Sequence, residues 1–377
     1  MKKIILYIWS FVCVCPLFAQ SGPVFSGTVF EKGDNGVHTY RIPSMVQTNA
    51  GTILAFAEAR KNSSKDTGDI DLVLRRSSDG GRTWGEIITV WDDAENVCGN
   101  PTPVVDRTTG RILLFSTWNN GLDVEKDIRI RASIDTRRVF VLYSDDDGLT
   151  WTDAREITSD VKLPEWTWYA TGPCHAIQLT KGKYKGRIVV PCNHDIFGER
   201  THSHVFYTDD AGESFHLGGC LEVGNESTVA ELKNGDLLLN MRGSKTETRV
   251  EKGAARFAAV SHDGGKTFED PYNEYGLIEP VCNASIINYY RNGRTTSTLL
   301  FSNPEHKTKR KNMSVRQSDD SGRTWRTVCR LSDFPAAYSD LLVLDNRDVA
   351  ILYETGVDSC YEKIVFSVLP RKIFNKN

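Results

Sequence analysis

Three histidines lie close together in the stretch "HDIFGERTHSHVF", at His194, His202 and His204, and histidine is a common metal ligand. His202 and His204 are two residues apart, so both side chains would lie on one face of a strand, as a metal site could require. No third ligand accompanies them at the spacing usual for zinc. We therefore expect no metal site in this stretch.

The cysteines offer little reactive chemistry either. Nine are present, no two of them in a C-x-x-C motif, and Cys13 and Cys15 fall in an N-terminal segment that we expect to be removed. Seven remain, an odd number, so at least one is unpaired within a monomer. A chain of this length folds without disulfide staples, which favours buried, apolar cysteines. The sequence also lacks the G-x-S-x-G, P-loop and G-x-G-x-x-G motifs.

Composition narrows the class of protein. The chain has 377 residues, 40% hydrophobic and 25% charged, with a formal net charge of −3 and no dominant basic cluster, so a nucleic-acid partner is not expected. The start "MKKIILYIWSFVCVCPLFAQ" predicts a secretory signal that is cleaved after Ala19. We expect a signal peptide over 1–19, one domain over 20–377, no membrane span, and a secreted or periplasmic protein.

One eight-residue turn recurs along the chain. It reads "SSDGGRTW", "SDDDGLTW", "TDDAGESF", "SHDGGKTF" and "SDDSGRTW", with aspartates at 79, 146, 210, 263 and 320. The aspartate can accept hydrogen bonds from amides further along, the fifth-position glycine permits positive φ, and the final aromatic can pack over the turn. Each copy follows a β-type run, so each predicts a structural hairpin rather than a ligand site.

The spacing of these turns predicts an architecture. The aspartates are 67, 64, 53 and 57 residues apart, and a mature chain of about 355 residues then holds about six such units. Further short β-type runs lie before, between and after the turns: "TILAFAEA", "RILLFSTW", "RIVVPCN", "DLLLNMR", "STLLFSN" and "VAILYET". We therefore expect an all-β, single-domain, six-bladed β-propeller, with one blade closed by both termini.

The most specific stretch is "YRIP" at 40–43. It resembles the F/Y-R-I-P motif of exo-α-sialidases (neuraminidases), and the repeated turns resemble the Asp boxes of that family. Asp boxes also occur in other propellers, but the motif, its order and the number of boxes are specific together, and the resemblance extends along the whole mature chain. It implies an enzyme that removes terminal sialic acid from glycans.

The resemblance implies a set of arginines for the substrate. Sialic acid carries a carboxylate on its anomeric carbon, and the planar, bidentate donors of arginine suit this group. Three arginines hold it in the family, and the matching positions here are Arg41 in "YRIP", Arg242 in "LLLNMRG" and Arg316 in "NMSVRQS". Arg256 is the second choice for the place of Arg242, since it lies on a strand that leads into an Asp box.

The nucleophile of sialidases is a tyrosine, where most retaining glycosidases use a carboxylate. A neutral phenol avoids Coulomb repulsion with the substrate carboxylate, but its pKa of about 10 makes it weak unless a base lies beside it. The resemblance implies Tyr338, in "AYSDL", as nucleophile and Glu226, in "GNESTVAEL", as its base. Glu231 is a competitor for Glu226 that reads better as a strand-end residue.

The acid/base of the family lies on a loop after a second pocket arginine. The stretch "AEARKNSSKDTGDIDLVL" supplies Arg60 and Asp66 in these places, and its Ser, Lys, Asp and Gly residues suit a flexible flap. Asp69 and Asp71 are competitors. The acid would protonate the leaving oxygen and later deprotonate the incoming water.

Supporting positions follow from the same resemblance. Glu354 would brace Arg41, while Arg60 and Asn100 would line the C4 side of the sugar and Trp118 would cover its N-acetyl group. The aglycone or glycerol chain would contact aromatic residues of "WTWYATGPCHAIQL": Trp166, Trp168 and Tyr169.

The expected function is therefore retaining hydrolysis of sialylated glycans, glycoproteins or oligosaccharides, with Asp66, Tyr338 and Glu226 as the catalytic residues. This chemistry implies no cofactor, and the sequence leaves open whether the protein binds a structural calcium ion. Two alternatives also stay open. One is a trans-sialidase or intramolecular trans-sialidase on the same fold, and the other is a non-catalytic propeller that binds sialic acid.

Overall fold

The computed structural model describes residues 22–199, 201–243, 255–291 and 293–374; the expected signal peptide lies outside them. The first half of the chain forms β1 (Phe25–Glu31), β2 (Thr39–Gln47), β3 (Ile53–Arg60), β4 (Ile70–Ser77), β5 (Ile88–Trp91), β6 (Val97–Val105), β7 (Ile112–Asn119), β8 (Arg138–Ser144), β9 (Arg155–Glu156), β10 (Trp166–Thr171) and β11 (Ile177–Gln178). The second half forms β12 (Ile188–Ile196), β13 (Thr201–Thr208), β14 (His216–Leu221), β15 (Ser227–Glu231), β16 (Leu237–Met241), β17 (Arg256–Ser261), β18 (Tyr272–Glu274), β19 (Ser285–Asn288), β20 (Leu299–Pro304), β21 (Lys311–Ser318), β22 (Arg326–Val343), β23 (Val349–Thr355) and β24 (Lys363–Leu369).

Helices are few and short in the described residues. The two α-helices are α1 (Glu125–Arg129) and α2 (Thr158–Val161), and the 3-10 turns are Asp34–Gly36, Gly182–Tyr184 and Arg371–Ile373. No helix of the described residues is long and apolar enough to cross a membrane. The prediction of an all-β protein is confirmed, and each of the six further β-type runs overlaps a strand.

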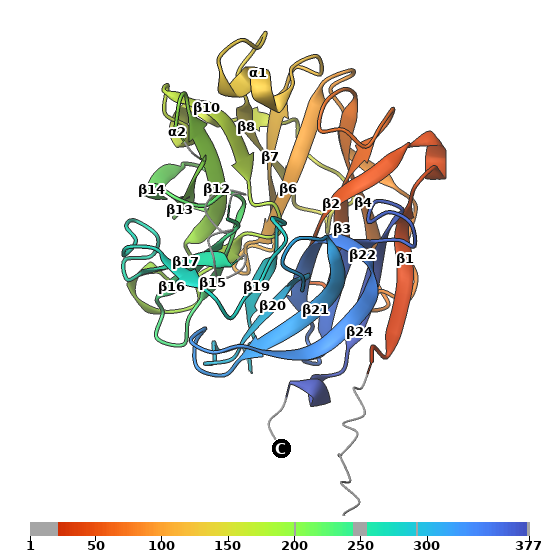
Figure 1. Cartoon of the computed structure of the whole chain (residues 1–377), viewed down its shortest axis with the longest axis vertical. Coiled ribbons are helices and arrows are strands. Elements are labelled where there is room, and N and C mark those ends of the chain that lie inside the picture. Colours follow the sequence, from red (N-terminus) through yellow and green to blue (C-terminus); the bar gives the residue numbers. More distant parts are fainter. Residues whose placement is uncertain (1–21, 200, 244–254, 292, 375–377) are drawn as a thin grey trace, which may run out of the picture.

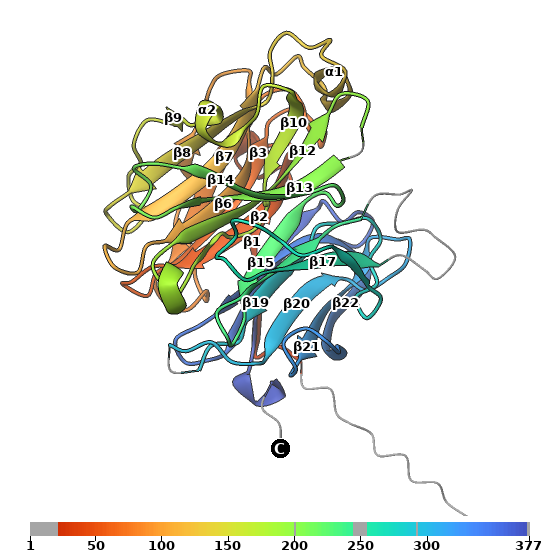
Figure 2. The same ribbon diagram turned by 90° about the vertical axis from the view of Figure 1, so that its left-hand side faces the viewer.

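The strands form four sheets in which neighbours pair antiparallel, except for the parallel pair of β4 with β6 (Figure 1). Their orders are β2-β3-β4-β6-β7-β8-β9 with β5 on β4, β10-β12-β13-β14 with β11 on β12, β15-β16-β17-β18, and β19-β20-β21-β22-β23-β24-β1. In the view of Figure 2 the first of these sheets lies in the upper half of the molecule and β19 to β21 lie in the lower half.

Two features define how the largest sheets are composed. The eight-stranded sheet continues from β4 to β6 through a single parallel pair, Ile70 with Val97. In the seven-stranded sheet, the long strand β22 pairs with β21 through its first part and with β23 through its last part. The eight-stranded sheet thus consists of two successive groups of four strands. The seven-stranded sheet does too, because β22 belongs to both of its groups.

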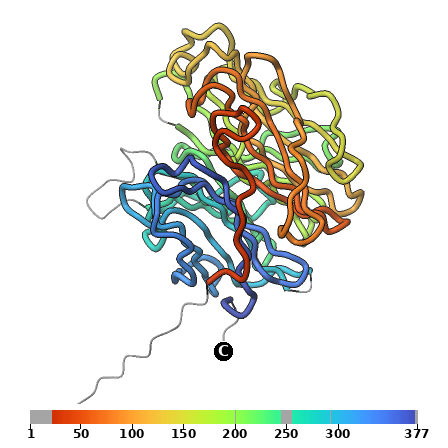
Figure 3. Tube along the Cα trace, turned by 90° about the vertical axis from the view of Figure 1, so that its right-hand side faces the viewer, coloured from red at the N-terminus to blue at the C-terminus, as the bar shows by residue number. Residues whose placement is uncertain are grey.

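The N-terminal strand completes the last group. Residues 25–31 of β1 pair with residues 363–368 of β24, so the two ends of the described chain share one sheet. Figure 3 shows the N-terminal segment, in red, beside the C-terminal strands, in blue.

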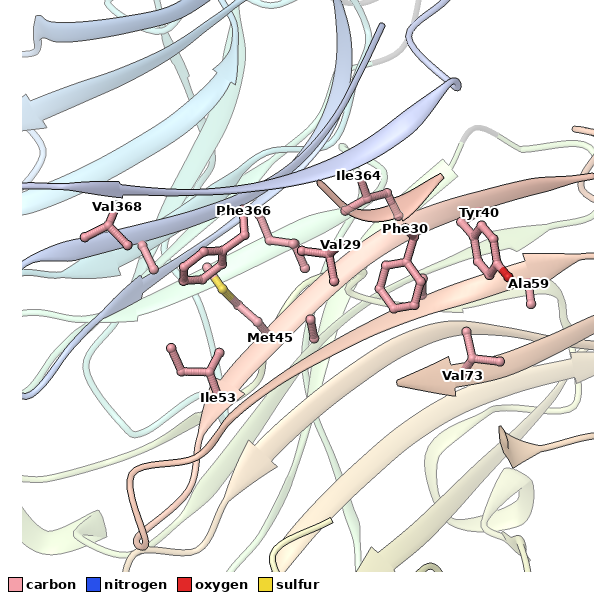
Figure 4. Packing of buried hydrophobic residues seen from close by; sticks show 14 of the residues in the cluster. Val29, Phe30, Tyr40, Met45, Ile53, Ala59, Val73, Ile364, Phe366 and Val368 are labelled. Atoms are coloured by element: carbon pink, nitrogen blue, oxygen red, sulfur yellow. The ribbon is translucent and has the colours of Figure 1, made fainter. Parts of the chain in front are cut away.

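Apolar side chains fill the space between this last group and the group β2 to β4. Phe30 of β1, Met45 of β2, Ile53 of β3 and Phe366 of β24 belong to this cluster, and each is at most 1% exposed (Figure 4). The first strand of each group is buried along nearly its whole length, as in β6 and β15, because both of its faces contact other elements.

The Asp-box turns form the predicted local hydrogen bonds. In the first copy Asp79 accepts from the Thr83 amide at 2.9 Å and from its hydroxyl at 2.6 Å, and Ser77 Oγ accepts from the Gly81 amide at 2.8 Å. The same pattern recurs around Asp146, Asp210, Asp263 and Asp320.

The structure adds a second reason for the glycine. Gly81 has φ +87°, and a Cβ atom there would lie 2.1 Å from the ring of Phe366 on β24. Trp84 of the same turn packs against Phe366 with ring centroids 5.3 Å apart. The box therefore also joins one group of strands to its neighbour, which favours a residue without a side chain.

Candidate active site

A cavity of about 250 Å³ lies at the ends of the strands that are opposite the Asp boxes. Its charged lining comprises six arginines and four carboxylates: Arg41, Arg60, Arg129, Arg137, Arg242, Arg310, Glu58, Asp66, Glu125 and Glu226. Tyr338, Tyr361, Trp168 and Asn100 also line it. No residue of an Asp box does, in agreement with the structural role predicted for these turns.

On the floor of the cavity, a tyrosine is hydrogen-bonded to a carboxylate. Tyr338 lies on β22 and is 6% exposed, and its hydroxyl donates to Glu226 Oε1. Arg242 Nη1 donates to the Tyr338 oxygen at 3.0 Å and also to Glu226 Oε2. The sequence separates these residues by as much as 112 positions, and the structure brings all three into contact.

Burial raises the pKa of the Tyr338 phenol well above its ordinary value of about 10, and the Glu226 carboxylate adds to the rise, while Arg242 and Arg310 oppose it. The phenol is therefore protonated at neutral pH. Its proton already points at a base, so the pair can deliver a phenolate oxygen to an electrophile as the proton moves to Glu226.

Arg41 is held by a buried carboxylate behind it. Glu354 of β23 is fully buried and contacts Arg41 Nε at 3.1 Å and Nη2 at 3.4 Å. The same carboxylate accepts the amides of Ile42 at 2.9 Å and Tyr338 at 3.0 Å. Glu354 thus fixes the guanidinium and the tyrosine backbone together, as expected for a residue that braces Arg41.

Arg316 does not lie with the other two predicted arginines. Its side chain is buried outside the cavity, where it donates to the carbonyls of Gly276 and Ile278 at 3.3 Å and lies 3.7 Å from Glu305. In place of Arg316, the structure brings the guanidinium group of Arg310 to the cavity, beside Tyr338. It donates to the Tyr361 hydroxyl at 2.9 Å, and its carbon lies 5.5 Å from the ring centre of Tyr338.

Strand geometry explains this correction. β21 runs from the cavity end at Lys311 to the Asp box after Ser318, and a strand advances about 3.3 Å per residue. Arg316 is therefore near the box end, far along the strand from the cavity. The signal that could have identified Arg310 is its place ten residues before the box aspartate Asp320, where a strand begins; Arg137 occupies a similar place before Asp146.

Asp66 lies at the mouth of the cavity on the loop between β3 and β4, with its side chain 65% exposed. Its Oδ1 lies 2.7 Å from Arg60 Nη2 and 3.6 Å from Arg41 Nη1. Partial desolvation opposes the charge of Asp66, but the guanidinium groups of Arg60 and Arg41 outweigh it and lower the pKa of the carboxyl group.

Arg60 and Asn100 share a second buried carboxylate, which the sequence analysis missed. Glu58 of β3 contacts Arg60 at 2.6 and 2.9 Å and accepts the Asn100 amide at 2.8 Å. Asn100 has φ +55°, and a Cβ on the preceding Gly99 would come within 2.8 Å of Glu58. A carboxylate two residues before a pocket arginine on a strand shares its face, and this spacing was the available signal.

Arg137 is a further residue that the sequence analysis did not identify. It is 3% exposed, donates to Asn100 Oδ1 at 2.5 Å and to Thr117 Oγ1 at 2.8 Å, and lies 4.1 Å from the ring centre of Trp168. Burial lowers the pKa of Arg137 to about 10. Since Arg137 and Thr117 both donate to Asn100 Oδ1, the Asn100 amide presents its NH₂ donors on its other side.

Of the aromatic residues predicted to contact the substrate, one lines the cavity and three do not. Trp168 lines the cavity, but Trp118 does not: its indole donates to Asp93 at 2.6 Å and packs at 5.2 Å from Arg138. On β7 the side chain of Trp118 lies on the face away from the cavity, since the alternate residue Thr117 faces Asn100. Trp166 and Tyr169 are buried in the core.

The structure also separates the competing residues. Arg256 is 0% exposed and lies behind the cavity wall, and Glu231 accepts amides of Thr180 and Lys181 away from it. Asp71 is buried against Lys61 at 2.6 Å, and Asp69 does not line the cavity. Among these alternatives, the first choices Arg242, Glu226 and Asp66 are the residues that line it.

The histidines pack among aromatic rings. His194 stacks on Trp166 with centroids 3.4 Å apart, and its Nδ1 lies 3.0 Å from that of His204. Burial lowers the pKa of His204 to about 3. No group of three or more His, Cys, Asp or Glu residues that could hold a metal ion occurs in the described part of the chain. The seven cysteines from Cys98 onward are unpaired.

Known proteins resemble this chain in sequence and fold. Residues 51–351 match the BNR repeat-like domain. The chain is 30% identical over 345 residues to a sialidase of Bacteroides fragilis, covering 86% of this chain and 61% of that protein. It is 32% identical over 304 residues to an exo-alpha-sialidase of Aspergillus fumigatus, covering 76% of this chain and 69% of that one.

A solved structure of a Hadza microbial sialidase superposes with a TM-score of 0.80 and 29% identity, over 92% of this chain and 68% of that chain. The Asp-box turns of this chain fit the BNR repeats of the matching family model. The chain belongs to the sialidase family. It spans less than two thirds of the length of its Bacteroides relative.

Proposed function

We propose that the protein is an exo-α-sialidase that hydrolyses terminal α-linked sialic acid from glycans, glycoproteins or oligosaccharides with retention of configuration. One observation carries this proposal: the Tyr338 hydroxyl, bonded to Glu226, lies on a floor flanked by the guanidinium groups of Arg41, Arg242 and Arg310. An anionic sugar held by these arginines would present its anomeric carbon to an uncharged attacker.

The first step forms a tyrosyl intermediate. The Tyr338 oxygen attacks the anomeric carbon and its proton passes to Glu226, while Asp66 gives a proton to the departing aglycone oxygen. In the free protein Arg41 and Arg60 favour the ionised form of Asp66. The substrate carboxylate places a negative charge beside Arg41, which weakens this effect and favours a protonated Asp66.

The second step regenerates the protein. Asp66, now ionised, takes a proton from water, whose oxygen attacks the anomeric carbon and displaces the Tyr338 oxygen, and the phenol recovers its proton from Glu226. The sum is one sialoside and one water converted to sialic acid and the free aglycone. Arg41, Arg242 and Arg310 hold the carboxylate throughout, and Arg60, Arg137 and Asn100 supply donors for the other side of the sugar.

The fold proposal is a six-bladed β-propeller over residues 20–377. The groups β2–β5, β6–β9, β10–β14, β15–β18, β19 to the first part of β22, and the last part of β22 to β24 with β1 would be its blades. The division of the two large sheets at Ile70–Val97 and within β22 supports this arrangement. The cavity would then occupy one end of the central axis.

Secretion or periplasmic export is part of the same proposal. The N-terminal stretch of two lysines followed by a short apolar run supports it. Expression of the full chain and intact-mass analysis of the exported protein test it. Loss of residues 1–19 is the expected result, and a protein that retains Met1 inside the cell overturns it.

Hydrolysis of a fluorogenic sialoside, followed in parallel by NMR, tests the activity. We expect free sialic acid released first as its α-anomer, and a mass increase of one sialosyl group on the quenched protein that is absent from Tyr338→Phe. A first product of β configuration would overturn retention. An anhydro or transferred sugar would establish the trans-sialidase alternatives, and binding without turnover would leave a sialic-acid-binding propeller.

A further inference from the structure

Behind the cavity wall lies a buried ion pair between Arg256, at the start of β17, and Glu279, on the loop between β18 and β19. Both residues are 0% exposed, and Arg256 Nη1 lies 3.4 Å from Glu279 Oε2. Neither lines the cavity. Buried charges need further hydrogen bonds to compensate for their lost hydration, so the partners of this pair show what it holds in place.

The Glu279 carboxylate accepts two backbone amides. Oε1 accepts the Gly243 amide at 3.0 Å, and Oε2 accepts the Cys282 amide at 3.1 Å. Gly243 directly follows Arg242, which contacts Tyr338. Cys282 directly follows Val281, whose carbonyl accepts from Arg310 Nη2 at 3.0 Å. One carboxylate thus fixes the segments that orient two of the three arginines beside the tyrosine.

Arg256 ties the same two segments from the other side. Its Nε donates to the Asn240 side chain at 2.5 Å, and its Nη1 donates to the Cys282 carbonyl at 3.0 Å. Asn240 lies on β16, two residues before Arg242. The pair therefore bridges the end of β16 to the loop that supports Arg310.

The residue next to Cys282, whose amide and carbonyl the pair binds, is in an unfavourable conformation. Val281 has φ +59°, which is costly for a β-branched residue and persists only where its surroundings enforce it. A related arrangement occurs at two other pocket arginines, where the carboxylate contacts the arginine directly and accepts the amide of the positive-φ residue itself. Glu354 contacts Arg41 and holds Ile42 at φ +57°, and Glu58 contacts Arg60 and holds Asn100 at φ +55°.

We propose that Glu279 and Arg256 are positioning residues that set the guanidinium groups of Arg242 and Arg310 for one carboxylate ligand. The expected consequence for catalysis rests on the proposed sialidase function, but the positioning itself does not. Glutamine at 279 has one oxygen and one NH₂ group, so it can accept only one of the two amides and leaves the other facing a donor.

The test compares Glu279→Gln with Glu231→Gln. Glu231 is also buried, at 1% exposed, and also accepts two backbone amides, but it lies at the opposite end of β15 from the cavity. Both variants remove the same charge, and both are expected to lower the melting temperature. Arg256→Lys, which keeps the charge but not the fork of donors, is the second variant and covers a failure of Glu279→Gln to fold.

We expect Glu279→Gln and Arg256→Lys to raise KM for a simple sialoside, and the inhibition constant of free sialic acid, by about tenfold in parallel. Glu231→Gln should leave both constants within about twofold of wild type. Unchanged constants in folded Glu279→Gln and Arg256→Lys, or an equal change in Glu231→Gln, would overturn the positioning role.

If the wild-type protein neither turns over nor binds sialosides, the proposed function is refuted. The positioning role of Glu279 and Arg256 can then still be tested by structure determination. Crystal structures of Glu279→Gln and Arg256→Lys then decide it. Displacement of the Arg242 and Arg310 guanidinium groups supports the claim, and guanidinium groups in their wild-type places refute it.

Discussion

The two ends of the strands are stabilised in different ways. At the Asp-box end each turn satisfies itself with partners four residues away, as Asp79 does with Thr83. At the cavity end the contacts join distant segments: Arg41 meets Glu354 across 313 positions, and Tyr338 meets Glu226 across 112. Positive φ values at Ile42, Asn100 and Val281 occur at this end beside buried carboxylates.

This difference assigns the stability of the fold mainly to the Asp-box end and the proposed chemistry to the cavity end. The box end repeats one local solution and joins neighbouring groups of strands through its glycine and aromatic side chain. The cavity end repeats only its bracing carboxylates, and it holds buried charges that would be unfavourable without their neighbours. Changes at the cavity end should therefore alter the chemistry, whereas changes at the box end should alter the free energy of unfolding.

Removal of the Tyr338 hydroxyl should have the largest effect. We expect Tyr338→Phe to lower kcat by at least about 10³-fold, because it removes the attacking oxygen while the ring still fills its place. The matched control is Tyr143→Phe at the box end, where the hydroxyl donates to the Gly212 carbonyl at 2.7 Å. Its kcat should equal that of wild type, and a comparable loss in both variants would contradict the comparison.

Substitution of two arginines six residues apart should affect different properties of the protein. Arg310→Met should raise KM by about 10–100-fold, because it removes a guanidinium group from the cavity. Arg316→Met should leave KM unchanged and lower the melting temperature, since Arg316 lies outside the cavity, donates to the carbonyls of Gly276 and Ile278 and approaches Glu305. Steady-state kinetics and thermal melts measure both, and a raised KM in Arg316→Met alone would reverse the assignment.

A methyl group in the first Asp box should destabilise the fold without changing the chemistry. Gly81→Ala should lower the free energy of unfolding by about 2–3 kcal/mol, because the new Cβ meets the Phe366 ring at 2.1 Å and φ is +87°. Gly51→Ala has the same φ penalty, at +89°, with nothing within 4 Å. Denaturant unfolding should show the smaller loss there, and equal losses would refute the role of close approach.

The smallest effect should be a pH dependence of one box. Hydrogen bonds from Thr150 lower the pKa of Asp146 to about 2, against an ordinary value of 3.8. A lowered folded-state pKa stabilises the protein above pH 4, and this contribution disappears as the pH falls from about 4 to 2. Asp146→Asn should therefore melt about 1–3 °C below wild type at pH 7, with the difference shrinking toward pH 2.

Asp153→Asn is the control for this charge, since Asp153 is exposed and lies just outside the box. It should melt at the wild-type temperature at both pH values. A constant difference between Asp146→Asn and wild type across the whole range would show that the carboxylate of Asp146 contributes nothing through its ionisation.

Much of the fold was predictable because its signals are local. The Asp boxes and the apolar runs such as "TILAFAEA" lie within a few residues of one another, so hairpins and strands follow from neighbouring side chains. Glu226 and Tyr338 each lie in a distinctive stretch of sequence, and the structure brings their side chains into contact. The prediction that Arg316 lies with Arg41 and Arg242 was wrong, because its motif indicates a strand but not which end of that strand meets the cavity.

The strands, the turns, the family and the charged residues available for chemistry could be predicted from the amino-acid sequence alone. Which of these residues meet depends on the packing of the strands: Arg310 rather than Arg316 lies beside Tyr338, and Trp118 lies outside the cavity. Glu58 lines the cavity beside Arg60, and Glu279 lies behind its wall. The physical reason is that local hydrogen bonds depend on neighbouring residues, whereas a shared cavity depends on which strand ends the packed sheets bring together.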